Sequence, residues 1–328
     1  MLAKNAIEVN HLTKRYNGTV AVDNIAFQVK EGEIFGFLGP NGAGKTTTLR
    51  LLTGLTRPTS GSATVGGHDI LTESVKVREH IGVVPEVSNI YDEMTAWDNL
   101  IFASQLYDVP KDQRETRAKE LLELFGLYER RTSRVGTFSR GMKRRVTIAT
   151  ALIHKPSILF LDEPTTGLDV QSSRTIRNLI KELNKSNVTV FLTTHYIEEA
   201  DQLCQRVAII NRGRIVTVSS PEKLKASAEK HQIIEVSFNQ GEDLERRLAN
   251  LDYVNRVTHV GDKFRLHVEN TSKTISLLVD FARKNELEIV SINTLKPSLE
   301  DAFVEMTGIA PEAMATEKEQ NKKGGNLS

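Results

Sequence analysis

Apolar and polar positions follow two periodicities along the larger, N-terminal part of the chain. Apolar runs at 34–38 and 157–161 are typical of buried parallel strands, and 188–193 is expected to be a further strand. The stretches 113–125 and 170–185 repeat apolar residues with the helical period instead. Strands that alternate with helices predict a mainly parallel α/β sheet.

Further segments extend this pattern on both sides. Residues 7–9 and 25–29 alternate apolar and polar positions as half-buried strands do, and 61–65 ends at a Gly-Gly turn. We therefore expect antiparallel strands beside the first parallel strand. The section 87–150 is rich in helical periodicity, so it predicts a helical subdomain within a first domain that covers 1–228.

The pattern changes beyond residue 228. Strands and helices then follow in the order βαββαβ, which predicts a small α+β domain of the ferredoxin-like type over 229–308. Its last helix is expected at 298–306, with Gly308 as the stop signal. The tail 309–328 is charged and poor in apolar residues, so we expect it to be disordered.

A glycine-rich loop follows the apolar run 34–38. Gly39, Gly44, Lys45 and Thr46 have the spacing G-x-x-x-x-G-K-[ST] of a P-loop. Such a loop turns backbone N–H groups toward a phosphate, its lysine reaches the β- and γ-phosphates, and its threonine ligates Mg²⁺. The expected nucleotide-binding residues are Gly39, Pro40, Asn41, Gly42, Ala43, Gly44, Lys45, Thr46 and Thr47.

Three polar residues end neighbouring apolar runs and narrow the chemistry. Asp162 ends one strand, where it can hold Mg²⁺ opposite Thr46. Glu163 follows it and can take a proton from water, and His195 follows the next strand. The sequence thus predicts a nucleoside triphosphatase with Mg²⁺ as a ligand, and the resemblance described next implies that the nucleotide is ATP.

These motifs resemble the ATP-binding subunit of an ABC transporter over residues 6–224. Gly39–Thr46 matches Walker A, Leu159–Glu163 matches Walker B with its catalytic glutamate, Gly167–Asp169 matches the D-loop and His195 the switch histidine. The resemblance implies a P-loop NTPase fold, with a RecA-like core, an antiparallel β subdomain and a helical subdomain. It also implies ATP hydrolysis coupled to transport, and a nucleotide contact for Asp169.

Two further matches concern contacts with the nucleotide, and the second of them implies a dimer. Tyr16 lies in a polar connection and matches the aromatic residue that stacks on adenine. The segment Phe138–Met142 matches the family's signature, with Ser139 and Gly141 retained. In the family, the signature contacts the γ-phosphate of the nucleotide that the other subunit binds. The resemblance therefore implies a head-to-tail homodimer.

Two departures from the family pattern stand out. Glu86 replaces the usual Q-loop glutamine, and its carboxylate can still ligate Mg²⁺. It is either an equivalent metal ligand or a residue whose negative charge lowers the rate of ATP hydrolysis. Arg140 also replaces a signature glycine and opens a basic run with Lys143, Arg144 and Arg145. That run is expected to be a solvated helix face, with added attraction for phosphate as the alternative.

The C-terminal part narrows the resemblance further. The ending Pro297–Glu305 is similar to the daunorubicin-resistance branch of drug exporters, whose separate permease is of the ABC-2 class. This branch implies export of drugs or other hydrophobic compounds; export of lipids, polysaccharides or sodium is the alternative, and a soluble ABC ATPase without a transporter is another. We expect the permease to dock on the helical section, notably at Ile90–Trp97.

Composition and charge exclude other classes. No window approaches the length of about 20 apolar residues that crosses a bilayer. A net charge of +1 gives no support for a nucleic-acid partner. The single cysteine, Cys204, excludes an internal disulfide and is expected to be buried. The resemblance to ABC ATP-binding subunits implies a peripheral location at the cytoplasmic face of the cell membrane.

Overall fold

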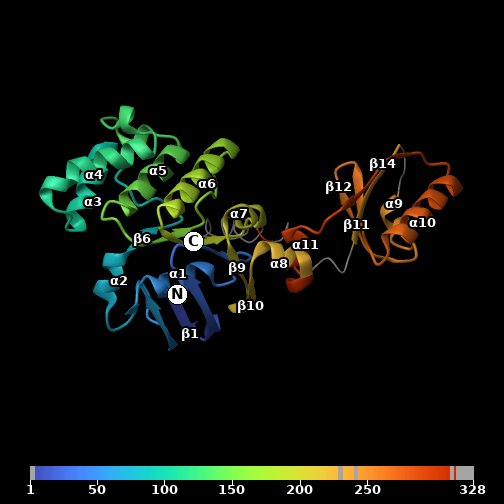
Figure 1. The fold of residues 1–328 in the computed structure, drawn as a ribbon, viewed down its shortest axis with the longest axis horizontal. Helices are drawn as coiled ribbons and strands as arrows, with labels where there is room; N and C mark the ends of the chain where they lie inside the picture. Colours follow the sequence, from blue (N-terminus) through green and yellow to red (C-terminus); the bar gives the residue numbers. More distant parts are fainter. Residues whose placement is uncertain (1–3, 228–231, 240–242, 311–313, 315–328) are drawn as a thin grey trace, which may run out of the picture. The chain divides into compact units, whose positions relative to one another are not determined.

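The computed structural model describes residues 4–227, 232–239, 243–310 and 314 (Figure 1). These residues form two compact units, one that ends at Pro221 and includes Met314, and a second that covers Glu222–Gly308. Each unit is described by itself below. Apart from residues 309, 310 and 314, the tail predicted to be disordered lies outside the described residues.

A six-stranded sheet forms the centre of the first unit. Its strand order is β10-β9-β3-β8-β7-β6, and all neighbours are parallel except β9 and β10. The apolar runs of the sequence form its central strands, which are buried over their full length because helices and a second sheet cover them. The strands are β3 (Ile34–Leu38), β6 (Ile81–Val84), β7 (Ile158–Asp162), β8 (Thr189–Thr194), β9 (Arg206–Asn211) and β10 (Arg214–Ser219).

A four-stranded antiparallel sheet packs against this centre, as predicted. Its order is β2-β1-β4-β5, formed by β1 (Asn5–Tyr16), β2 (Thr19–Lys30), β4 (Ser60–Val65) and β5 (His68–Asp69). Phe27 of β2 contacts Phe35 and Phe37 of β3, with ring centroids 5.5 Å apart in each pair. Phe191 joins the same buried cluster. These aromatic side chains bind the two sheets together.

Helices complete the first unit. Helix α1 contacts β7 and β8 of the central sheet and β2 and β4 of the antiparallel sheet, so it lies between them. Figure 1 shows α3, α4, α5 and α6 together on the opposite side from β1. The helices are α1 (Lys45–Leu52), α2 (Ser74–His80), α3 (Ala96–Leu106), α4 (Lys111–Leu124), α5 (Arg140–Ala151), α6 (Val170–Lys185) and α7 (Ile197–Leu203), with 3₁₀ turns at Tyr128–Arg130 and Val135–Thr137. Helix α8 (Pro221–Ser227) begins at Pro221 and continues in the second unit.

The strand order gathers the loops that carry the candidate residues. Strands β3, β8, β7 and β6 are consecutive neighbours, and all run in the same direction. Their carboxyl ends therefore meet at one edge of the sheet, where ligands bind in open α/β folds. The P-loop, His195, Asp162 with Glu163, and Glu86 follow these strands in that spatial order.

The structure corrects two expectations about local structure. Tyr16 is the last residue of β1 and pairs with Thr19, so it does not lie in a connection between strands. Helices α2 and α3 were not predicted. The start of α3 carries a readable signal, because Thr95 and Asp98 form a reciprocal pair in which Asp98 N–H donates to Thr95 Oγ1 at 3.0 Å.

The second unit has the predicted ferredoxin-like topology. Its antiparallel sheet has the order β12-β13-β11-β14, with a hydrophobic core that includes side chains of both helices α9 and α10. The last helix, α11, ends at Gly308, whose φ of 66° is accessible to glycine without strain. The elements are α9 (Leu244–Leu248), α10 (Thr271–Lys284), α11 (Leu299–Thr307), β11 (Gln232–Phe238), β12 (Val254–Val260), β13 (Lys263–Val268) and β14 (Ile289–Leu295).

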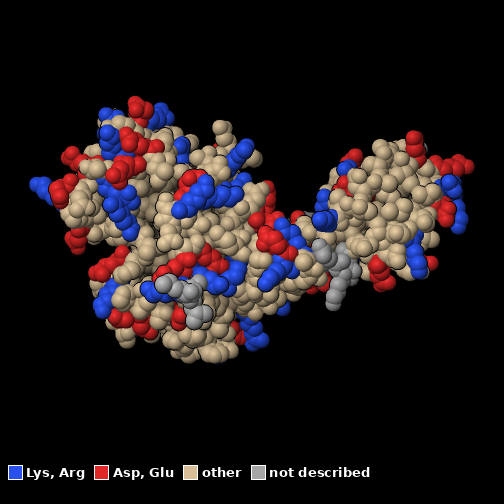
Figure 2. All heavy atoms as spheres, in the orientation of Figure 1, with Lys and Arg blue, Asp and Glu red and all other residues tan. Residues whose placement is uncertain are grey.

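Two surface properties bear on the location and the partners. Within the described residues, no helix is long and apolar enough to cross a membrane. On the face that Figure 2 shows, basic and acidic side chains are interspersed on both units. Cys204 is buried, as predicted.

Candidate functional site

Two glycines of the P-loop, Gly39 and Gly44, lie where a Cβ atom would clash with the backbone of other segments. A Cβ atom on Gly39 would lie 2.3 Å from the carbonyl oxygen of Ile210. Gly44 has a φ of 108°, and a Cβ there would lie 2.5 Å from the carbonyl oxygen of Ala21. Helix α1 begins directly afterwards at Lys45, so its N-terminal N–H groups and its dipole face the loop. The geometry is that of an anion site.

Lys45 is buried at the centre of this loop. Its Nζ donates to the carbonyl oxygens of Gly39 and Pro40 at 2.8 and 3.1 Å. It also forms an ion pair with Glu163 Oε1 at 3.2 Å, and both side chains are at most 5% exposed. The predicted phosphate-binding cation and the predicted base are thus direct partners.

Asp162 and Thr46 form the candidate metal position. Thr46 Oγ1 donates to Asp162 Oδ1 at 3.2 Å, and Thr193 Oγ1 donates to the same oxygen at 2.5 Å. Burial raises the pKa of Asp162 despite these hydrogen bonds. Because Mg²⁺ prefers oxygen ligands, a hydroxyl and a buried carboxylate in contact fit this ion. A cation there would also favour the ionised carboxylate.

Glu163 is held between Lys45 and His195. His195 Nδ1 lies 2.7 Å from Glu163 Oε2, and both side chains are buried. Burial is the largest influence on the pKa of Glu163 and raises it, but the hydrogen bond of His195 and the charge of Lys45 together bring it below its ordinary value. Glu163 is therefore ionised at neutral pH, as a general base must be.

The signature lies at the start of α5. Ser139 is the N-cap, and its hydroxyl accepts from Met142 N–H at 3.3 Å. Gly141 is buried against α6, where a Cβ would lie 2.4 Å from Ser172 Oγ. Asp169 caps α6 and accepts from Ser172 N–H at 2.8 Å. Ser139, Gly141 and Asp169 thus lie together, and no hydrogen bond between described residues joins them to the P-loop.

The remaining predicted ligands border the P-loop. The N–H of Asn41 donates to the carbonyl oxygen of Met314 at 3.4 Å, and Met314 is buried. Tyr16 is 42% exposed, with Lys14 Nζ 4.8 Å from its ring centroid. It opens the hairpin into β2, whose Ala21 lies against Gly44. This position leaves the ring accessible to a base.

The basic run is not a solvated helix face. Arg144 is 4% exposed, Lys143 forms an ion pair with Asp92 at 2.8 Å, and Arg145 donates to a backbone carbonyl at 2.8 Å. Only Arg140 among them is exposed. The expectation of solvation was wrong because these cations bind partners from other segments, which charge spacing does not reveal.

The burial of two charged groups near the site was not predicted. Arg144 donates to backbone carbonyls of the loops at Pro85 and Asp162. Glu199 of α7 is 1% exposed and accepts from Thr165 Oγ1 at 2.9 Å, and burial raises its pKa. Neither residue belongs to a motif whose spacing implies a ligand, so the sequence carries no signal for them.

The fold and this cluster define a class of protein. The site has a P-loop after a central strand, a buried lysine within that loop, a Thr–Asp pair that fits Mg²⁺ and an ionised carboxylate beside a histidine. This combination is typical of a P-loop nucleoside triphosphatase.

Comparison with known proteins specifies the family. Residues 22–166 match the model of the ABC transporter family, and residues 220–307 match the C-terminal domain of DrrA1-3-like ATP-binding proteins. The linearmycin resistance ATP-binding protein LnrL of Bacillus subtilis is 36% identical over 92% of this chain and 98% of its own. The daunorubicin/doxorubicin resistance ATP-binding protein DrrA of Streptomyces peucetius is 35% identical over 95% of this chain and 96% of its own.

Solved structures agree with this assignment. The dimeric, post-hydrolysis ATP-binding cassette MJ0796, bound to ADP and Pi, matches with a TM-score of 0.60 and 28% identity, over 65% of this chain and 98% of its own. The subunit cbiO1 of Clostridium perfringens matches with a TM-score of 0.63 and 26% identity, over 75% of this chain and 94% of its own. The chain belongs to the ATP-binding subunits of ABC transporters, in the drug-resistance and export group, and is an ATPase.

Proposed function

We propose that two copies of this chain hydrolyse ATP in a head-to-tail dimer and power export through a separate ABC-2 permease. The observation that carries the proposal is the buried cluster of Lys45, Glu163 and His195 beside the Thr46–Asp162 pair. Each Mg·ATP would lie between the P-loop of one copy and the Ser139 signature of the other. Among the described residues, no hydrogen bond connects Ser139 to the P-loop, which supports completion of the site by a second copy.

The residues of the cluster divide the chemistry. Glu163 takes the proton from the attacking water, since its pKa is below its ordinary value and its carboxylate is ionised. His195 holds Glu163 in place and contacts the γ-phosphate when it is present. Lys45 turns from Glu163 to the phosphates. Mg²⁺, held by Thr46 and Asp162, would neutralise charge on the phosphate oxygens.

Glu86 adds a carboxylate to this edge of the sheet. Its charge raises the pKa of Asp162, behind burial and the charge of Glu163. Glu86 therefore adds negative charge to the surroundings of the candidate metal position. We propose that it binds Mg²⁺ and slows turnover.

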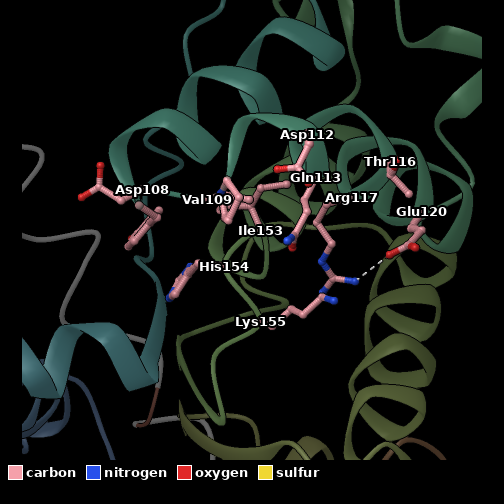
Figure 3. Close-up of a pocket in the computed structure, with 12 residues that line it drawn as sticks. Asp108, Val109, Asp112, Gln113, Thr116, Arg117, Glu120, Ile153, His154 and Lys155 are labelled. Carbon is pink, nitrogen blue, oxygen red and sulfur yellow. Dashed lines mark hydrogen bonds and ion pairs between the residues drawn. The ribbon is translucent and has the colours of Figure 1, made fainter.

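The helical section offers a groove for the permease. Residues that directly follow the Glu86 loop line a cavity of about 160 Å³ together with α3, and exposed apolar side chains such as Tyr91 and Leu106 lie at it. A second cavity of about 340 Å³ is lined by residues that include Arg117 and His154 (Figure 3), and Tyr107 lines both cavities. The groove supports docking of a cytoplasmic segment of the permease, which would place the chain at the cytoplasmic face of the membrane.

The transported compounds are proposed from the relatives. The names of LnrL and DrrA refer to linearmycin, daunorubicin and doxorubicin resistance, and the Nod factor export ATP-binding protein I of Burkholderia pseudomallei is 34% identical over 92% of this chain. Drugs and other hydrophobic compounds are therefore the proposed cargo. Lipids, polysaccharides and sodium remain the alternatives.

Substitution of the base tests the ATPase mechanism. Glu163→Gln should bind ATP and dimerise, but lose about 10²- to 10⁴-fold in the rate of hydrolysis, the usual contribution of a general base. Glu199→Gln, which neutralises another buried carboxylate nearby, is the matched control and should hydrolyse ATP normally. Near-normal hydrolysis by Glu163→Gln would exclude the proposed role.

Transport is tested with the permease. Inside-out vesicles that contain the chain together with the permease encoded beside it should accumulate doxorubicin when ATP is added, and vesicles with Glu163→Gln should not. Accumulation of sodium or a lipid but not of doxorubicin would favour the alternatives. Normal ATP hydrolysis without any membrane partner encoded nearby would favour an ATPase that acts outside transport.

A further inference from the structure

A single buried guanidinium connects two loops of the active site. Arg144 of α5 is 4% exposed, and burial lowers its pKa to about 10, so it remains a cation at neutral pH. Its contacts are backbone carbonyl oxygens, which belong to the loop after β6 and to the turn after β7. It forms no ion pair at contact distance among the described residues.

One side of the guanidinium holds the turn that carries the base. Arg144 Nη2 donates to the carbonyl oxygens of Asp162 at 2.8 Å and Glu163 at 3.2 Å, and Nε donates to that of Pro164 at 3.0 Å. Consecutive carbonyls of the catalytic turn thus converge on one side chain. A planar group with donors in a fixed fork sets their relative orientation, which a point charge cannot do.

This turn requires such support because its backbone is unusual. Glu163 has a φ of 48°, in the left-handed region that residues with a Cβ rarely adopt. Its N–H is held by the carbonyl oxygen of Thr193 at 3.1 Å, and its own carbonyl is held by Arg144. The two contacts fix both peptide groups of Glu163, and so the direction in which its carboxylate points.

The other side of the guanidinium holds the loop after β6. Arg144 Nη1 donates to the carbonyl oxygens of Pro85 and of Glu86, the latter at 3.3 Å. The chain continues from Glu86 directly into the segment that lines the groove beside α3. The Arg144 guanidinium therefore contacts both the loop at Pro85 and Glu86, which connects to the groove, and the turn that carries the Glu163 carboxylate.

We propose that Arg144 is a positioning residue that sets Glu163 relative to the loop at Pro85 and Glu86. A movement of that loop shifts the guanidinium and with it the carbonyls of Asp162 to Pro164. ATP affinity does not depend on Arg144, because it contacts no residue of the P-loop. The proposal rests on the proposed role of Glu163 as the base.

Steady-state hydrolysis and ATP binding by full-length variants test this role. Arg144→Lys keeps the charge but loses the fork, and Arg144→Gln also loses the charge. Both should lower kcat about 100-fold, the effect of a catalytic group displaced by about 1 Å, and change the Kd for ATP by no more than about twofold. Lys143→Gln is the control, because the neighbouring Lys143 contacts only exposed Asp92, and it should keep both constants.

A combined variant separates positioning from general damage. In the Glu163→Gln background, Arg144→Lys should cause no further loss of kcat, because residues that act as a unit are not additive. A full further loss there, a parallel rise in the Kd for ATP, or normal kcat in Arg144→Lys would overturn the proposal. Arg144→Lys decides the matter where Arg144→Gln does not fold. Normal hydrolysis by Glu163→Gln alone would instead refute the base.

Discussion

The ion pair between Lys45 and Glu163 makes a prediction about nucleotide affinity. Lys45 is expected to contact the phosphates, yet without nucleotide it lies 3.2 Å from Glu163 Oε1. Binding must break this pair. In Glu163→Gln the opposing charge is absent, so we expect a nucleotide to bind more tightly than to the unmodified chain.

The magnitude follows from the separation and the burial. At 3.2 Å and an effective dielectric constant of about 20, the Coulomb attraction between the two charges is about 5 kcal/mol. Solvent that enters with the nucleotide and the hydrogen bond between His195 and Glu163 offset most of it. If about a quarter persists, the Kd falls about tenfold in the variant.

Calorimetric titration with Mg·ADP measures this effect cleanly. ADP lacks the γ-phosphate that is proposed to join two copies, so dimerisation does not contribute to its affinity. Glu199→Gln is the matched control and should bind ADP as the unmodified chain does. An equal or weaker affinity of Glu163→Gln for ADP would refute the reasoning, because it would show that the pair does not oppose binding.

Three further predictions concern single residues. Gly39→Ala should lower the free energy of unfolding by about 1–3 kcal/mol in urea denaturation and abolish ATP binding, because its Cβ would meet the carbonyl of Ile210; wild-type affinity would contradict this. Glu86→Gln should raise the ATPase rate severalfold and change its Mg²⁺ dependence; an unchanged rate and dependence would show that Glu86 is an equivalent ligand. Burial lowers the pKa of His154 below its ordinary value of 6.5, so as the pH falls through 6.5 the unfolded chain takes up the proton first and the folded state loses stability. In His154→Gln, the loss of stability measured by urea denaturation between pH 7 and 5 should therefore be smaller. An equal loss in the variant and the unmodified chain would contradict the reasoning.

Much of the core was predictable because its strands are buried on both faces. The runs at 34–38 and 157–161 are continuously apolar, and the structure forms β3 and β7 there. The ferredoxin-like order was likewise readable from alternating patterns and turns. Lys45, Thr46 and Asp162 come together as motif spacing implies, since the carboxyl ends of neighbouring parallel strands share one edge.

The missed features depend on contacts between distant segments. A basic run reads alike whether water or backbone carbonyls surround it, so the burial of Arg144 could not be inferred from charge. Glu163, which pairs directly with Lys45, has a left-handed backbone conformation. The residue types at this turn do not predict that conformation. The residues around Tyr16 are polar and predict a connection, although they form part of β1. The pairing of β1 with β2 contains bulges, so the strand does not show a regular alternation of apolar and polar residues.

Each catalytic site is proposed to take its signature from a second copy of the chain. Lys45→Ala and Ser139→Phe should each abolish hydrolysis when measured alone. Mixed in equal amounts, they should recover about a quarter of the unmodified rate, because half of the dimers then contain one intact P-loop facing one intact signature. A mixture that stays as inactive as its two components would contradict the claim.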